Sequence, residues 1–357
     1  MISTEVTRAF GMTYPIFSAG MARVSQAPLV AAVSEAGGMG CLGGVSYYPE
    51  ALRQEIRNIR ALTSRPFAVN LLAFESPESA EGWAQAQAAW NGLSPAQREK
   101  LKGVEPLLMP GMAKDQVAVV LEERPAALVL AFGAPRTVLE ACHARGIKAM
   151  AICGSVGRAV AASASGYDYV IAQGTEGGGH TGHVGTLVLV SAIVDAVRQP
   201  VIAAGGIVDG RGLAAALCLG AQAVWCGTRF VASTEAYGHD AYKRRIVTAT
   251  VKDTTVTAAY TGKSLRTLRN AWTDRWERAA PPSAGFPAQY AIAAERVESG
   301  YQDGDIEEGM MPAGQGAGLI RDIPPAGEIV RRMAHDAARI LESLGREVRH
   351  DAARESN

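Results

Sequence analysis

The chain has 357 residues, of which 48% are hydrophobic and 20% are charged, so it is long and apolar enough to bury a large core. Its 35 basic residues balance its 35 acidic ones, which excludes an overall charge favouring nucleic acid or an anionic membrane. We therefore expect a small-molecule ligand that is bound locally.

The cysteines and the chain start indicate the compartment. The five cysteines are odd in number and include no CxxC pair, which argues against a disulfide framework and against a zinc cage. The chain opens without the cationic and apolar segments of a signal peptide, and no apolar run approaches the roughly 20 residues of a spanning helix. These features predict a cytoplasmic protein without a metal site.

Short runs that are apolar throughout recur along the chain, and each precedes a stretch with helical spacing. Such runs are typical of parallel strands, which are covered on both faces. The expected strands are 15–20, 38–44, 67–72, 126–132, 148–153, 168–173, 200–206 and 223–228. Eight strand–helix units in one chain predict an α/β fold, the (β/α)8 TIM barrel.

Two segments interrupt this alternation, residues 73 to about 125 and residues 235 to about 310. We expect one barrel domain over residues 1–357, with both insertions covering the barrel mouth. The second insertion holds Trp272 and Trp276 four residues apart, which fits either a surface helix burying both rings or a lid that contacts substrate. The last helical pattern is expected to close the barrel.

Glycines stand where a barrel would place its active site, at the carboxyl ends of the strands. The seventh expected strand ends in Gly205 and Gly206, and the eighth ends in Gly227 and Thr228. Either these are ordinary glycine turns, or their exposed N–H groups bind a phosphate between the two strands. No GxGxxG follows the first strand, so the pattern favours FMN or a sugar phosphate over a dinucleotide in a Rossmann fold.

The stretch "AQGTEGGGHTGH" (172–183) follows the sixth expected strand. Its three consecutive glycines, 177–179, would let the backbone run close against a flat ring system, with His180 projecting over it. Histidine suits proton transfer because its unperturbed pKa lies near neutrality, although a loop histidine without a role is the alternative. A metal pair with His183 is disfavoured, since no carboxylate or third ligand stands at metal-site spacing.

Several motifs occur together and in order: "PIFSAGM", "AVSEAGGMGCLGG", "FAVNLL", "AQGTEGGGHTG", "PVIAAGGIVDGRGLAAALCLGAQAVWCGTRF" and "GDIEEGMMPAGQGAGLI". From about residue 8 to residue 325 the chain thus resembles the nitronate monooxygenase family, formerly called 2-nitropropane dioxygenases. Flavin-dependent enoyl-acyl-carrier-protein reductases and NAD(P)H:quinone reductases share the same FMN barrel and closely related motifs.

The resemblance implies positions for the cofactor and the base. His180 matches the family's catalytic base. Some relatives have a polar side chain after the fifth strand, near the flavin pyrimidine, where this chain has Ile152; Ser155 or backbone N–H groups are expected to take its place. The residues that the resemblance assigns to FMN are Ala19, Gly20, Met21, Asn70, Gln173, Gly178, Gly179, Ala204, Gly205, Gly206, Gly227, Thr228, Gln315 and Gly316.

The activity that the resemblance implies is FMN-dependent oxidation of alkyl nitronates by O2, which yields a carbonyl compound and nitrite. An NAD(P)H-dependent FMN reductase acting on quinones or enoyl thioesters is the nearest alternative. A barrel similar to IMP dehydrogenase would need a cysteine in the loop after the sixth strand, where this chain has glycines and His180. A non-enzymatic FMN-binding protein and a homodimeric assembly are left open.

Overall fold

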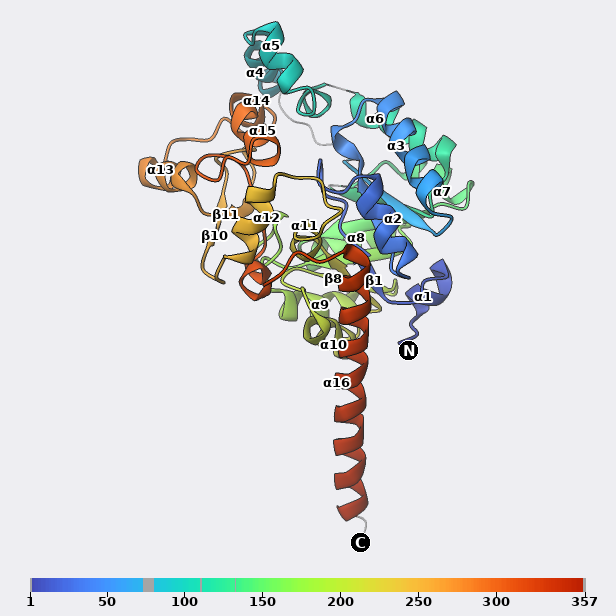
Figure 1. Cartoon of the computed structure of the whole chain (residues 1–357). Helices are drawn as coiled ribbons and strands as arrows, with labels where there is room; N and C mark the ends of the chain where they lie inside the picture. Colours follow the sequence, from blue (N-terminus) through green and yellow to red (C-terminus); the bar gives the residue numbers. More distant parts are fainter. Residues whose placement is uncertain (1, 73–79, 110, 132, 356–357) are drawn as a thin grey trace.

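The computed structural model describes residues 2–72, 80–109, 111–131 and 133–355. Its main sheet has eight parallel strands in the order β1-β9-β8-β6-β5-β4-β3-β2. A parallel bridge between Phe17 and Met39 joins the two ends of this sheet, and the Ser18 N–H donates to the Met39 carbonyl at 3.0 Å. The predicted TIM barrel is thus confirmed (Figure 1).

Each barrel strand falls within a range expected from the sequence. Residue 132 of the fourth range lies outside the described residues, as do residues 73–79 and 110 of the first insertion. The barrel strands are β1 (Ile16–Ser18), β2 (Gly40–Gly43), β3 (Phe67–Leu72), β4 (Ala127–Ala131), β5 (Lys148–Cys153), β6 (Tyr169–Gln173), β8 (Val201–Ala204) and β9 (Ala223–Cys226).

Helices surround the barrel and extend from it. Those in the first half of the chain are α1 (Glu5–Phe10), α2 (Ala27–Glu35), α3 (Pro49–Leu62), α4 (Ala80–Asn91), α5 (Pro95–Lys100), α6 (Met112–Glu123), α7 (Arg136–His143) and α8 (Val156–Ser165). Those in the second half are α9 (Thr186–Ala196), α10 (Gly210–Cys218), α11 (Thr228–Val231), α12 (Asp240–Val247), α13 (Ala271–Ala279), α14 (Ala288–Ile292), α15 (Ala294–Gln302) and α16 (Ala326–Glu355).

The strands are apolar throughout because both of their faces are buried. In β4, Leu128 and Leu130 belong to the cluster packed between strands and helices, whereas Ala127 and Val129 belong to a separate cluster inside the barrel. Alternate residues of a strand point to opposite faces, so an unbroken apolar run fills both layers. This is the arrangement that the sequence predicts.

The first helix fills one end of the barrel interior. Phe10 of α1 places its ring 6.1 Å from that of Phe17 and 5.2 Å from that of Tyr169, which stands at the start of β6. Because parallel strands all begin at the same end, these rings occupy the amino end of the barrel. The opposite, carboxyl end of the barrel is therefore the end that is free to hold a ligand cavity.

The last helix packs against the barrel's helices. α16 contacts α10 and α2, and Figure 1 shows it continuing well past the body of the molecule.

Asp209 caps the start of α10, because its carboxylate accepts from the N–H groups of Arg211 at 3.0 Å and Gly212 at 3.2 Å. In the described part of the chain, no helix has the length and apolar character that a membrane crossing requires.

The insertions are more ordered than their sequences indicate. In the first, α6 buries Val117 and Val120 and packs against α3, so the end of this insertion is an ordinary barrel helix. The second insertion contributes β10 (Thr254–Thr257) and β11 (Leu265–Leu268), which form a three-stranded sheet with β7 (Gly179–His180). Helix α4 packs against α14, so the two insertions contact each other.

Candidate active site

A cavity of about 650 Å³ opens at the carboxyl ends of the strands. Its volume lies within the roughly 300–1,000 Å³ of typical ligand pockets. Both insertions contribute to its wall, the first through Leu107 and the second through residues such as Tyr242 and Tyr290. The predicted site residues that line it are Ala19, Gly20, Met21, Asn70, Gln173, Gly178, Gly179, His180, Ala204, Gly205, Gly206, Gly227, Thr228 and Gly316.

Some predicted residues also hold the barrel together. Gln315 is absent from the described lining of the cavity, and its N–H donates instead to the Glu176 carbonyl at 3.0 Å. The Asn70 amide donates to the Val129 carbonyl of β4 at 3.0 Å, while the Gln173 amide donates to the His180 carbonyl at 2.6 Å. These bonds fix where both side chains stand at the cavity wall.

The turns after β8 and β9 form a cradle of backbone N–H groups. Gly205 and Gly206 have φ values of +105° and +71°, a conformation that favours glycine. A Cβ on Gly205 would stand 2.6 Å from the Thr186 hydroxyl. Among the described residues, none accepts a hydrogen bond from the N–H of Gly205, Gly206 or Gly227. Backbone N–H donors of this kind beside the start of a helix suit the oxygen atoms of a bound anion such as a phosphate.

His180 is held in a short strand at the cavity wall. Its strand, β7, pairs antiparallel with β11, where Leu265 stands opposite His180. The His180 Nε2 lies 3.0 Å from the Thr261 hydroxyl oxygen. The second insertion therefore fixes both the backbone and the ring of the predicted base.

Burial and a neighbouring cation lower the pKa of His180. Burial is the larger cause and the charge of Lys263 is the second, and together they bring the pKa of His180 to about 4. Lys263 also lines the cavity, with its Nζ 4.8 Å from the centre of the Phe286 ring. The imidazole is therefore neutral near pH 7, which is the form that can accept a proton.

The cavity wall carries positive charge. Among the described lining residues, Arg23, Arg158 and Lys263 are cationic, and none is an aspartate or a glutamate. Arg23 forms a buried ion pair with Glu298 behind the wall and also donates to the Tyr290 hydroxyl at 3.1 Å. The described wall therefore carries cationic side chains and no carboxylate side chain, and such a field favours an anionic ligand.

The structure places the two tryptophans of the second insertion. Trp272 and Trp276 of α13 are half-buried, their rings lie 6.0 Å apart, and neither belongs to the described cavity wall. In the described part of the chain, no group of three or more histidine, cysteine or acidic residues could hold a metal ion. All five cysteines are free thiols.

Several residues at the wall carry no recognisable signal in the sequence. Thr261 and Lys263 come from the irregular part of the second insertion, and Arg23 stands just after β1. No spacing rule marks them, because they reach the cavity through tertiary contacts. Ile152, expected near the flavin, is half-buried at the wall beside Ser155.

The fold and the site define a class: a TIM-barrel enzyme with a glycine cradle, a neutral histidine and a cationic cavity wall. Comparison with known proteins gives the family. The family model described as nitronate monooxygenase matches residues 3–336. The chain belongs to the nitronate monooxygenase family, and it is accordingly a flavin-dependent oxidoreductase.

Individual relatives agree over nearly the whole chain. A nitronate monooxygenase from Paraburkholderia phytofirmans is 35% identical over 94% of this chain and 95% of its own length. The structure of FabK from Thermotoga maritima is 35% identical, with a TM-score of 0.79 over 96% of this chain and 99% of its own. A nitroalkane oxidase from Streptomyces ansochromogenes is 30% identical, with a TM-score of 0.80 over 95% and 99%.

Proposed function

We propose that the protein uses FMN to oxidise alkyl nitronates with O2, forming a carbonyl compound and nitrite, and that His180 deprotonates neutral nitroalkanes. The observation that carries the proposal is the position of His180, whose pKa burial and Lys263 lower, at a cavity wall whose described residues include no carboxylate side chain. A nitronate is an anion, so this wall would favour it. The names of the nitronate monooxygenase and nitroalkane oxidase relatives agree with this substrate class.

The residues of the cradle fit a flavin that bears one phosphate. The N–H groups of Gly205, Gly206 and Gly227, with Thr228, would bind the phosphate, where a Cβ would block its approach. The glycines at 178–179 and residues 19–21 would lie along the ring system. A bound flavin would supply the redox chemistry, taking electrons from the nitronate and passing them to O2.

The chain's own residues would manage the proton and the charge. When His180 takes the α-proton of a neutral nitroalkane, the C–H bonding electrons stay on the substrate and an imidazolium and a nitronate form together. Burial and, after it, the charge of Lys263 disfavour the imidazolium and lower the pKa of His180, whereas the Lys263 ammonium attracts the nitronate. Lys263 would therefore bind the product anion of the proton transfer.

The purified protein is expected to be yellow and to release FMN, not FAD, when it is denatured. The reason is that the cradle provides one phosphate site and the chain has no dinucleotide fingerprint. Chromatography of the released flavin against FMN and FAD standards measures this. Released FAD, or a folded protein that stays colourless after incubation with FMN, would contradict the proposed cofactor.

A further inference from the structure

The ring of His180 is held by a residue from the second insertion. The Thr261 side chain is 3% exposed, and its hydroxyl oxygen lies 3.0 Å from the His180 Nε2. The same hydroxyl can donate its hydrogen to the Lys263 carbonyl, 3.2 Å away. Its oxygen lone pairs then stay available to an N–H of the imidazole.

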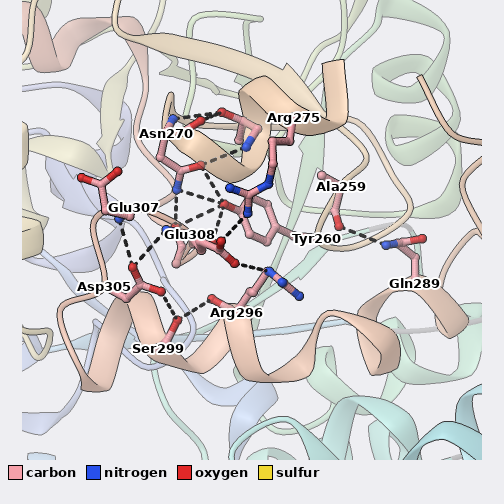
Figure 2. Close-up of polar contacts among 12 residues, drawn as sticks. Ala259, Tyr260, Asn270, Arg275, Gln289, Arg296, Ser299, Asp305, Glu307 and Glu308 are labelled. Atoms are coloured by element: carbon pink, nitrogen blue, oxygen red, sulfur yellow. Dashed lines mark hydrogen bonds and ion pairs between the residues drawn. The ribbon is translucent and has the colours of Figure 1, made fainter. Parts of the chain in front are cut away.

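The segment that carries Thr261 is fixed by a buried polar network (Figure 2). The neighbouring Tyr260 is fully buried, and its hydroxyl donates to the Glu308 carbonyl at 2.9 Å. The Asn270 amide donates to the Tyr260 hydroxyl at 3.1 Å. On the other side of Tyr260, the Ala259 carbonyl accepts from the Gln289 amide at 3.0 Å.

Ion pairs brace this network from outside. The Glu308 carboxylate lies between the guanidinium groups of Arg275 and Arg296, at 2.9 Å from the Arg296 Nε. The Glu308 backbone carbonyl thus accepts from Tyr260, while the Glu308 side chain is bound to α13 through Arg275 and to α15 through Arg296. Because Thr261 follows directly on Tyr260, this network holds its hydroxyl in one place. A catalytic side chain needs neighbours whose positions are fixed in this way.

We propose that Thr261 is a positioning residue for His180: its hydroxyl accepts a hydrogen bond from Nε2–H, which leaves Nδ1 unprotonated to take up the substrate proton, and this bond strengthens when the ring becomes an imidazolium. This inference rests on the proposed function of His180 as the base. In the step, the substrate C–H bond breaks, its proton passes to the imidazole, and its electron pair stays on the nitronate. Thr261 itself exchanges no proton.

The Thr261 hydroxyl favours the imidazolium because its hydrogen bond with Nε2–H is stronger when the ring is charged. Without the hydroxyl, Nε2–H would lose this hydrogen bond, at a greater cost in the product of the proton transfer than in the neutral ring. The loss should slow proton abstraction by about 10- to 100-fold, the size expected for one lost hydrogen bond to a charged group. Oxidation of a preformed nitronate needs no such transfer and should change little.

The test compares Thr261→Val, which keeps the shape of the side chain but removes the hydroxyl, with Thr261→Ser, which keeps the hydroxyl. Flavin-loaded variants are assayed on a neutral nitroalkane and on its preformed nitronate. We expect Thr261→Val to lower kcat on the nitroalkane by about 10-fold or more while nitronate turnover stays within about 2-fold, because the hydrogen bond is strongest to the imidazolium. Thr261→Ser should restore the nitroalkane activity.

Two further readouts separate positioning from support of the fold. The acid limb of the pH–rate profile should move to lower pH in Thr261→Val, because the charged ring has lost a partner. The ¹⁵N chemical shift of the His180 Nε2 should change in Thr261→Val and return in Thr261→Ser. Thr255→Val, on β10 of the same sheet, is the control for an equivalent substitution and should leave this shift unchanged.

The outcomes distinguish this inference from the proposed function. Equal losses on both substrates, or wild-type activity and an unchanged ¹⁵N shift in Thr261→Val, would overturn the role of Thr261 while leaving His180 as the base. No loss of nitroalkane turnover in His180→Asn would instead overturn the proposed function. If Thr261→Val fails to fold, Thr261→Ala supplies the same comparison.

Discussion

A Gly227→Val variant is expected to fold and to bind FMN at least about tenfold more weakly than the wild type, because it should lose one or more hydrogen bonds to a charged group worth about 1.5–3 kcal/mol each. Gly227 has φ −97° and ψ −78°, so a side chain needs no left-handed backbone there. Its added Cβ would stand 3.6 Å from the Met21 sulfur and 3.7 Å from the Ala19 Cβ, which are ordinary contacts. The new side chain would thus enter the cavity without a clash with these residues.

Flavin occupancy, measured from the ratio of visible to ultraviolet absorbance after gel filtration, checks this expectation. Gly157→Val is the matched control, since a Cβ at Gly157 meets nothing within 4 Å. A Gly206→Val variant is harder to interpret, because φ is +71° there and a β-branched residue would be strained whatever the ligand does. Full FMN occupancy in Gly227→Val would mean that the phosphate binds elsewhere.

A His180→Asn variant is expected to lose about 10²- to 10⁴-fold in turnover of neutral nitroalkanes, the usual contribution of a positioned base. Preformed nitronates have already lost this proton, so their turnover should fall much less. Initial rates of both substrates at saturating O2 give the ratio of the two activities. His183→Asn, which removes a second imidazole three residues along the chain, should leave that ratio unchanged. Equal losses on both substrates in His180→Asn would indicate a histidine that binds the nitro group.

The wild-type pH profile adds a constraint on the same residue. A general base works in its unprotonated form, and the lowered pKa of His180, about 4, keeps it unprotonated through the neutral range. The kcat/KM for a neutral nitroalkane should therefore be level well above this pKa and fall tenfold per pH unit below it. The kcat/KM for a preformed nitronate should lack this dependence on His180. A fall in kcat/KM centred near the ordinary pKa of histidine would contradict a lowered pKa for His180.

The barrel could be predicted because its signal is local. Each strand is a continuous apolar run, since both of its faces are buried, and β4 shows how such a run serves two layers. The glycine turns after β8 and β9 could be located for the same reason, as they stand at strand ends. Fourteen of the fifteen proposed site residues, all but Gln315, consequently line one cavity.

The support of His180 could not be predicted. Its strand, β7, has only two residues, too few for any periodicity, and it exists because β11 pairs with it. Thr261 lies 81 positions away in the chain, and its hydroxyl reaches the imidazole only after the second insertion has folded. Helix α6 lies within the first expected insertion, and its few buried valines stand among polar and charged residues that weaken the helical pattern.

Flavin reduction in the absence of oxygen distinguishes a site that oxidises nitronates from one that is reduced by a nicotinamide. In a stopped-flow instrument, the protein loaded with FMN is mixed anaerobically with an alkyl nitronate and, separately, with NADH or NADPH, and the flavin absorbance is followed. We predict that the nitronate bleaches the flavin rapidly, at rates matching turnover, and that neither nicotinamide does. Rapid bleaching by NAD(P)H with no reaction of the nitronate would mean that the protein is an NAD(P)H-dependent reductase and does not oxidise nitronates.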